Sequence, residues 1–326
     1  MTCELCVSLV TTTLKTGCHK RALKQRKGNM MIDKQGQPTI FLASEIEQCP
    51  LAEAAFAVLP VPYEKTVSYG SGTARGPEAI LVASEQLETW DGHSNPSSLG
   101  IHTCMAVDCS GQAEDVIESI AMAVKQILDA GSMPVVLGGE HTVTYGVIKA
   151  YLDAGVTDFG VVQIDAHADL RDAYEGDPLS HASVMKRIVD EGIPLYQLGI
   201  RAYCGEEKAI RESNPHIYYQ DADELVPQAI QSIQLPDAFP EKVFFTVDID
   251  GLDPSVFPST GTPVPGGLGW YQTLNLFESV ARHRQIIGFD IMEFSPLQNL
   301  HAYDFAAALL SYKMMGIVQR TSNMMS

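Results

Sequence analysis

Two short segments carry residue types that could do chemistry at the ends of apolar runs. The segment VVQIDAHADLR places Asp165, His167 and Asp169 at alternate positions, and VFFTVDIDGLDP repeats this spacing with Asp248 and Asp250. Because successive residues of a strand point to opposite faces, alternate side chains project in one direction. Carboxylates gathered in this way repel one another and resist ionisation unless a cation lies between them. Taken together, the two segments predict a metal site.

A third segment, GGEHT, adds His141 as a second imidazole after a Gly138–Gly139 turn that would let the following residues approach the site. Each segment alone also fits a turn or a helix cap, so the prediction depends on the combination. Two imidazoles and four carboxylates without a thiolate favour two Mn²⁺, with Ni²⁺, Co²⁺, Fe²⁺ or zinc as alternatives. Bridging carboxylates hold such ions about 3.5–4 Å apart, and a shared water then becomes a hydroxide near neutral pH.

The elements that must position these residues are buried strands separated by amphipathic helices. Continuous apolar runs of this kind are typical of a parallel sheet that is covered on both faces. We therefore predict one three-layer αβα domain with a mainly parallel central sheet, whose site lies beyond the carboxyl ends of the strands. The expected strands are 54–62, 133–139, 160–165, 194–200, 243–250 and 286–292, and the clearest helices are 115–131, 271–283 and 304–318.

Composition narrows the class of partner. The 326 residues carry a net charge of −18, which argues against nucleic acid or an anionic membrane and suits a small cationic substrate. No apolar run is long enough to span a membrane. Seven cysteines, an odd number, indicate reduced thiols in a cytoplasmic protein. Residues 1–35 are basic and unpatterned, so we expect a disordered extension ahead of a catalytic domain at 36–326.

The motifs GGEHT, DAHADLR, SHAS and DIDGLDPSVFPSTGTPVPGG together resemble those of the ureohydrolase family, which includes arginase and agmatinase. The resemblance runs from about residue 54 to 318. It implies a dinuclear manganese site on an arginase-like αβα fold, and hydrolysis of guanidino groups to urea and an amine. By this resemblance one ion is held by His141, Asp165, Asp169 and Asp248, and the other by His167, Asp165, Asp248 and Asp250.

Three residues are expected to act on the substrate. Asp169, beside the attacking hydroxide, could accept its hydrogen and orient it. The resemblance implies that Glu293 pairs with the guanidinium, whose fork geometry matches a carboxylate, and that His181 carries a proton to the departing amine. Taken alone, Glu293 also fits a surface acid at a helix start, and His181 fits a residue beside a helix cap.

The loop RDAYEGDPLSH carries Asp172, Glu175 and Asp177 where arginases have Asn, Thr and Ser. These acids would oppose an α-carboxylate but could receive a distal ammonium, so we predict agmatine as the substrate, giving putrescine and urea. Guanidinobutyrate, guanidine, arginine and formiminoglutamate are alternatives within the same chemistry, and a non-catalytic family subunit is an alternative outside it. The resemblance also implies a homo-oligomer, a trimer or hexamer.

Overall fold

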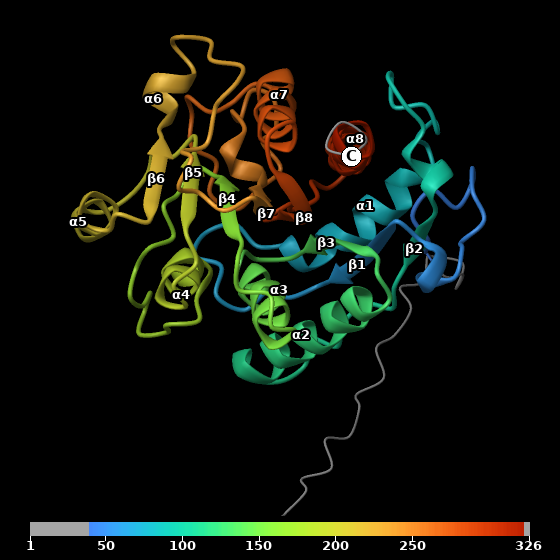
Figure 1. Ribbon diagram of the computed structural model, residues 1–326, viewed down its shortest axis with the longest axis horizontal. Coiled ribbons are helices and arrows are strands. Elements are labelled where there is room, and N and C mark those ends of the chain that lie inside the picture. Colours follow the sequence, from blue (N-terminus) through green and yellow to red (C-terminus); the bar gives the residue numbers. More distant parts are fainter. Residues whose placement is uncertain (1–38, 323–326) are drawn as a thin grey trace, which may run out of the picture.

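The computed structural model describes residues 39–322, so the predicted basic extension at residues 1–35 lies outside the described residues. Within this range, eight strands form one sheet in the order β2-β1-β3-β8-β7-β4-β5-β6, and every neighbouring pair is parallel (Figure 1). The strands are β1 (Phe56–Val61), β2 (Ile101–Thr103), β3 (Met133–Gly138), β4 (Gly160–Ile164), β5 (Leu195–Leu198), β6 (Ile217–Gln220), β7 (Lys242–Asp248) and β8 (Gln285–Met292). The predicted parallel sheet is confirmed.

Helices cover both faces of this sheet, as predicted (Figure 1). One face carries α2 (Ala113–Asp129), α3 (Thr142–Asp153) and α4 (Val184–Asp190), and the other carries α1 (Gly76–Ser84), α7 (Trp270–Ala281) and α8 (Ala302–Ser322). The short helices α5 (Gly205–Ser213) and α6 (Ala222–Leu225) lie near the β6 edge.

Consecutive strand residues enter the two separate cores that these layers create. Val161 and Phe244 pack with the α2, α3 and α4 side, whereas Val162 and Phe245 pack with the α1, α7 and α8 side. This alternation explains why the central strands read as unbroken apolar runs, since neither face of the sheet meets water.

Two short strands, β2 and β6, of three and four residues, were not predicted from the sequence. Both lie at the edges of the sheet, where a strand pairs on one side only. Strand β6 is only partly buried, with Ile217 in the core and Tyr219 exposed, so it lacks the apolar run by which the central strands were recognised. The turn predicted after Gly139 is also brief, because α3 begins at Thr142 directly after His141.

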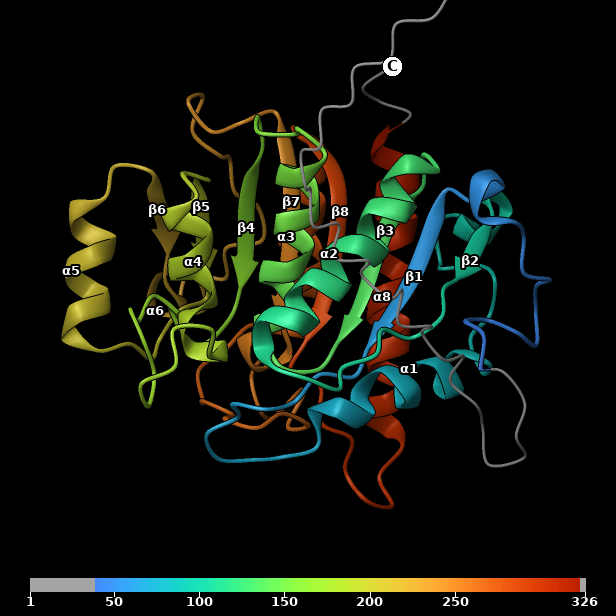
Figure 2. The same ribbon diagram turned by 90° about the horizontal axis from the view of Figure 1, so that it is seen from below.

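All strands run in the same direction, so the loops that follow them gather at the carboxyl ends of the strands (Figure 2). The four central neighbours are β3, β8, β7 and β4. Each of the motifs that carry metal ligands, together with Glu293, follows or ends one of these four strands. The fold therefore brings four distant parts of the chain to one place.

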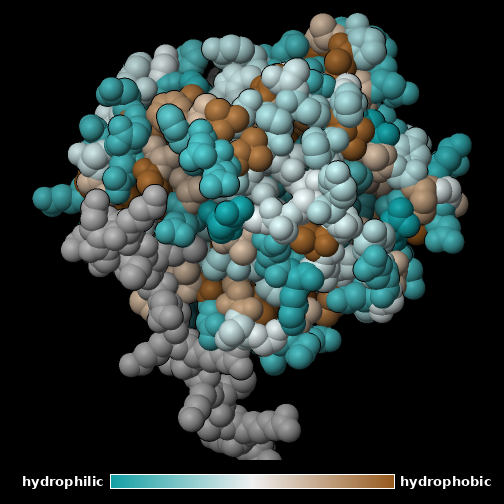
Figure 3. All heavy atoms as spheres, turned by 180° about the vertical axis from the view of Figure 1, so that it is seen from behind, coloured by the Kyte–Doolittle hydropathy of each residue, from teal (hydrophilic) through white to brown (hydrophobic). Residues whose placement is uncertain are grey.

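The outer surface is largely hydrophilic, with scattered apolar residues on the face shown in Figure 3. Among residues 39–322, no helix combines the length and the apolar character that crossing a membrane requires.

Candidate metal centre and active site

The six predicted metal ligands lie together beyond the carboxyl ends of the central strands. The Nδ1 atom of His141 lies 3.1 Å from Asp165 Oδ2, 3.1 Å from Asp169 Oδ2 and 3.3 Å from Asp248 Oδ2. The Nδ1 atom of His167 lies 2.9 Å from Asp250 Oδ2 and 3.7 Å from Asp165 Oδ1. Two adjacent groups of potential ligands result, and Asp165 belongs to both.

The electrostatics of this cluster fit a pair of divalent cations. Without a cation, burial and the charge of Asp165 raise the pKa of Asp169 to about 7. Burial, followed by the charges of Asp250 and Asp165, raises the pKa of Asp248 well above its usual range. The buried Nδ1 atom of His141 faces three carboxylate oxygens at 3.1–3.3 Å without the geometry of a hydrogen bond to any of them. A cation between these atoms would keep the carboxylates ionised and take the nitrogen as a ligand, and the oxygen and nitrogen donors suit Mn²⁺.

A layer of buried polar side chains orients the cluster from behind. Gln163 donates to Asp165 Oδ2 at 2.7 Å, and Gln197 in turn donates to Gln163 Oε1 at 2.7 Å. The Nε2 atom of His141 lies 2.9 Å from Thr246 Oγ1, which leaves Nδ1 to face the carboxylates. The sequence analysis missed these residues. A signal was present, since Gln163 and Thr246 are polar residues inside apolar strands, two positions before Asp165 and Asp248.

Glu293 follows β8 and lies beside His141. Its Oε1 atom accepts a hydrogen bond from the backbone N–H of His141 at 2.8 Å, and its own N–H donates to Gly139 O at 2.8 Å. The side chain is 7% exposed and lines the cavity. Burial, followed by the charge of Glu140, raises its pKa well above the usual range. A guanidinium cation in the cavity would stabilise the ionised form of this carboxylate.

The two glycines of GGEHT allow neighbouring segments of the chain to lie close to β3. A Cβ atom on Gly139 would lie 1.9 Å from the carbonyl oxygen of Tyr63, and one on Gly138 would lie 2.0 Å from Sδ of Met292. Neither glycine has a positive φ. Their small size therefore lets β3 run against its neighbours and places His141 next to Glu293.

His181 lies in the short helical turn after the 171–180 loop and also lines the cavity. Its Nδ1 atom lies 3.1 Å from Thr66 Oγ1, and its ring meets the ring of Tyr174 edge-on at 5.8 Å. Burial, with a smaller contribution from the neighbouring imidazoles, lowers the pKa of His181 to about 4. The imidazole is therefore neutral near pH 7.

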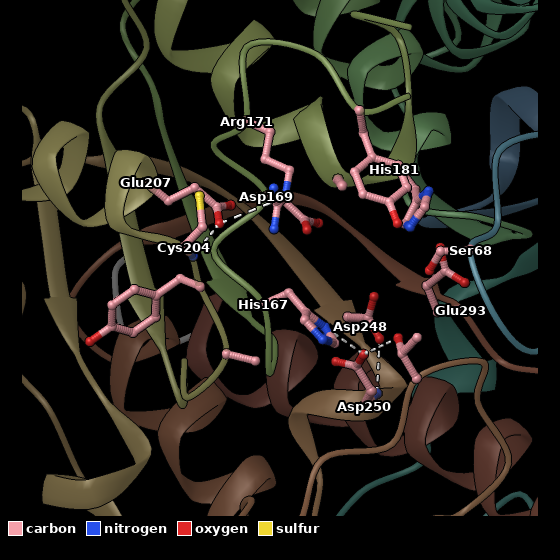
Figure 4. A pocket seen from close by; sticks show the side chains of 15 residues that line it. Ser68, His167, Asp169, Arg171, His181, Cys204, Glu207, Asp248, Asp250 and Glu293 are labelled. Carbon is pink, nitrogen blue, oxygen red and sulfur yellow. Dashed lines mark hydrogen bonds and ion pairs between the residues drawn. The ribbon is translucent and has the colours of Figure 1, made fainter. Parts of the chain in front are cut away.

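The cavity has a volume of about 300 Å³ and opens beside the cluster (Figure 4). Of the predicted site residues, six line it: His167, Asp169, His181, Asp248, Asp250 and Glu293. His141 and Asp165 are fully buried behind this wall. The sequence analysis missed most of the remaining lining, which includes Ser68, Arg171, Tyr174, Tyr203, Cys204, Glu207 and Thr262. All of these follow strands, so the rule that sites gather beyond strand ends was the available signal.

Comparison with known proteins agrees with this geometry. The sequence model of the Arginase family matches residues 54–316, most of the chain. The chain belongs to the arginase family. The resemblance to ureohydrolases is thereby confirmed, as is the arginase-like fold.

Relatives of this arginase-family enzyme include an N(1)-aminopropylagmatine ureohydrolase from Synechocystis sp., which is 40% identical over 86% of this chain and 94% of its own. An agmatinase from Pyrococcus horikoshii is 30% identical over 85% and 96%. Among solved structures, the agmatine ureohydrolase of Thermoplasma volcanium superposes with a TM-score of 0.75 at 26% identity, covering 88% of this chain and 97% of that one. The enzyme is accordingly a hydrolase of guanidino compounds from a family that depends on two metal ions.

None of the three loop acids lines the cavity, so the structure gives no support to their predicted contact with a distal ammonium. Asp172 projects outward with its side chain 88% exposed and pairs with Arg187, and Asp177 accepts a hydrogen bond from the N–H of Leu179. The cavity lining includes a different carboxylate, Glu207, which lies beside Arg171.

Proposed function

We propose that this enzyme binds two Mn²⁺ and releases urea from an alkylguanidine that carries a second amine at the far end of its chain. The observation that carries the proposal is the shared position of Asp165 between two imidazole–carboxylate groups, whose members His167, Asp169 and Asp250 line one cavity with Glu293. His141 and Asp169 would serve one ion, His167 and Asp250 the other, with Asp165 and Asp248 common to both.

Two cations held by these ligands would lower the pKa of bound water and so supply a nucleophile for the guanidino carbon at neutral pH. The chain's own residues supply binding and proton transfer. Glu293 has one oxygen bound to the His141 N–H, and its other oxygen is left to hold the guanidinium in the cavity. Asp169 accepts a hydrogen bond that orients the attacking water, and His181 delivers a proton to the departing amine.

The end of the cavity lined by Glu207 and Arg171 affects which substrate can bind. Glu207 is 3% exposed there, accepts backbone hydrogen bonds from Leu170 and Cys204, and lies 3.9 Å from Nε of Arg171. The two charges offset each other, so no unpaired cation awaits a substrate carboxylate. Tyr203 is 42% exposed at this end. A long amine chain could pass these residues toward solvent.

Agmatine, giving putrescine and urea, remains our proposal for the simplest substrate. A longer one, N1-aminopropylagmatine, is favoured by the relatives, because the ureohydrolases named for it reach 40% and 37% identity whereas the agmatinases reach 30–32%. We therefore expect both compounds to be hydrolysed, with the larger kcat/KM for N1-aminopropylagmatine.

Urea release from the Mn²⁺-loaded protein tests this proposal. The substrates to compare are agmatine, N1-aminopropylagmatine, arginine, guanidinobutyrate, guanidine and formiminoglutamate, the last followed by release of formamide. A preference for arginine or guanidinobutyrate would reject the distal-amine assignment, and no hydrolysis of any compound would reject the proposed activity. The control is Glu293→Gln, which should keep its metal but release urea at least about a hundredfold more slowly.

We also propose a cytoplasmic homo-oligomer, a trimer or hexamer, on the family resemblance. The four cysteines in the described part of the chain are free thiols, which fits a reducing compartment. Light scattering after size-exclusion chromatography should give three or six times the 35.5 kDa of one chain, and a monomer would reject the assignment.

A further inference from the structure

We infer that Thr66 and Glu140 are positioning residues that hold His181 in a single tautomer, with its proton on Nδ1 and a bare Nε2 facing the cavity. The inference deepens the proposed function, because it rests on His181 as the group that transfers a proton to the departing amine. Neither Thr66 nor Glu140 lines the cavity, so both would act through His181.

The Thr66 hydroxyl has fewer hydrogens than neighbours. Its Oγ1 atom has three neighbours: Glu140 Oε1 at 2.8 Å, the backbone N of His181 at 3.0 Å and Nδ1 of His181 at 3.1 Å. A hydroxyl has one hydrogen to donate and two lone pairs to accept. A carboxylate can only accept, so the hydroxyl hydrogen goes to Glu140. The His181 backbone N–H fills one lone pair, and the other requires a hydrogen on Nδ1.

The carboxyl group of Glu140 is fully buried, and its neighbours indicate whether it is ionised. Its Oε2 atom accepts the backbone N–H groups of Lys65 and Thr66. Its Oε1 atom lies 2.8 Å from the hydroxyl of Thr66 and 3.0 Å from that of Thr142, whose one hydrogen can also go to Leu179 O at 3.1 Å. Two backbone N–H groups, which can only donate, share one oxygen, and the Thr66 hydroxyl lies at the other, so the arrangement matches an ionised carboxylate that accepts at both oxygens.

The Nδ1 atom of His181 has one competing neighbour, the hydroxyl of Ser180 at 3.4 Å. This contact is longer than that to Thr66, and Ser180 also accepts the N–H of Ala182. Ser180 is therefore the weaker determinant. Among the described residues, Nε2 of His181 has no hydrogen-bond partner, while its ring lines the cavity (Figure 4).

The tautomer matters for the reaction because only a bare Nε2 can accept a proton. As water adds to the guanidino carbon, Nε2 takes the proton that this water loses, and the carboxylate of Glu140 stabilises the imidazolium through Thr66. As the C–N bond breaks, the same proton passes to the amine nitrogen and the imidazole returns to its starting state. The opposite tautomer would present an N–H to the cavity and could not begin this cycle.

The tautomer can be read directly in the metal-free protein by ¹⁵N NMR of ¹⁵N-histidine-labelled chain at pH 7. His181 is assigned by the signals that disappear in His181→Asn. We expect a protonated Nδ1 and a bare Nε2 in the wild type and in Thr66→Ser, which keeps the hydroxyl. A wild-type His181 protonated on Nε2 would overturn the inference.

Two variants should change this state. Thr66→Val removes the acceptor and should leave a mixture of tautomers. In Glu140→Gln the amide oxygen must face the two backbone N–H groups, so its NH₂ faces Thr66, whose hydroxyl then donates to Nδ1 and moves the proton to Nε2. Unchanged His181 signals in either variant would also reject the inference.

With metal and substrate, kcat should fall at least about tenfold in Thr66→Val and Glu140→Gln while KM changes less, and Thr66→Ser should restore most of kcat. The NMR measurement needs no substrate. If His181 carries its proton on Nδ1 but no guanidino compound is hydrolysed, the proposed function fails and the tautomer assignment stands. If urea is released but Nε2 is protonated, only the tautomer assignment fails.

Discussion

Asp169 and Glu293 both occupy the left-handed region of backbone space, with φ of 53° and 58°. Residues with a side chain rarely adopt this conformation, and it persists where the surroundings over-determine it. Glu293 is held by its N–H bond to Gly139, and the carbonyl of Asp169 accepts the N–H of Lys186. The strained backbone thus belongs to two residues whose side chains line the cavity.

At the residue scale, the shared position of Asp165 predicts the metal stoichiometry of single variants. We expect about two ions per chain in the wild type, about one in His167→Asn and close to none in Asp165→Asn, because Asp165 faces both groups. Metal analysis after dialysis measures this. The matched control is Asp172→Asn, an exposed carboxylate on the same loop, which should retain both ions. Equal loss in His167→Asn and Asp165→Asn would contradict the assignment.

At the scale of elements, the site depends on how closely the central strands approach one another. A Cβ atom on Gly251, after β7, would lie 2.8 Å from the backbone N of Asp165 beyond β4, and one on Gly139 would meet Tyr63 beyond β1. Loops that follow different strands are therefore in backbone contact beneath the ligands. This contact fixes the spacing between side chains that are far apart in the sequence.

Gly139→Ala tests this dependence. The added methyl group must displace the Tyr63 carbonyl or the GGEHT turn, and we expect a loss of about 1–3 kcal/mol in the free energy of unfolding. Denaturant unfolding of the metal-free protein measures the loss. Gly205→Ala is the control, since a Cβ atom there meets nothing within 4 Å, and it should be close to neutral. Equal stability of the two variants would show that the close approach is not required.

At the scale of the whole molecule, the ligands link loops from both halves of the sheet, so metal binding should stabilise the entire fold. His141 and His167 are the groups that must lose protons. Burial lowers the pKa of His167 but Asp165 and Asp250 outweigh it and raise this pKa to about 12, while the carboxylates around His141 raise its pKa well above the usual range in the same way. Both imidazoles are therefore charged in the metal-free protein near neutral pH, and a cation must displace their protons.

The stabilisation by Mn²⁺ should consequently increase with pH. Raised pKa values mean that the metal-free form binds protons at neutral pH, so each proton displaced improves metal affinity about tenfold per pH unit. Asp169, with a pKa of about 7, adds to this dependence between pH 6 and 8. Melting temperatures with and without Mn²⁺ from pH 5.5 to 8 should diverge as pH rises, because tighter binding to the folded state raises Tm. A difference that stays constant over this range would contradict the predicted proton release.

The sequence by itself determined the layer architecture and the identity of the ligand cluster. Unbroken apolar runs indicate strands that are buried on both faces. The Asp and His residues at every second position of DAHADLR and DIDG indicate which side chains point in the same direction. Both are local properties of the chain. For Glu293 and His181, local pattern was insufficient, and their predicted roles depended on resemblance to a family.

Only the tertiary structure decided which strands are neighbours and where the loop side chains point. It placed β8 between β3 and β7, which brings Glu293 against the backbone of His141. It also turned Asp172 away from the cavity and brought Glu207 and Thr66 to its surroundings. The physical reason is that strand pairing and the direction of a loop side chain depend on contacts between residues 50 or more positions apart, such as those of Thr66 with His181 and of His141 with Glu293, and the periodicity of a single segment carries no record of them.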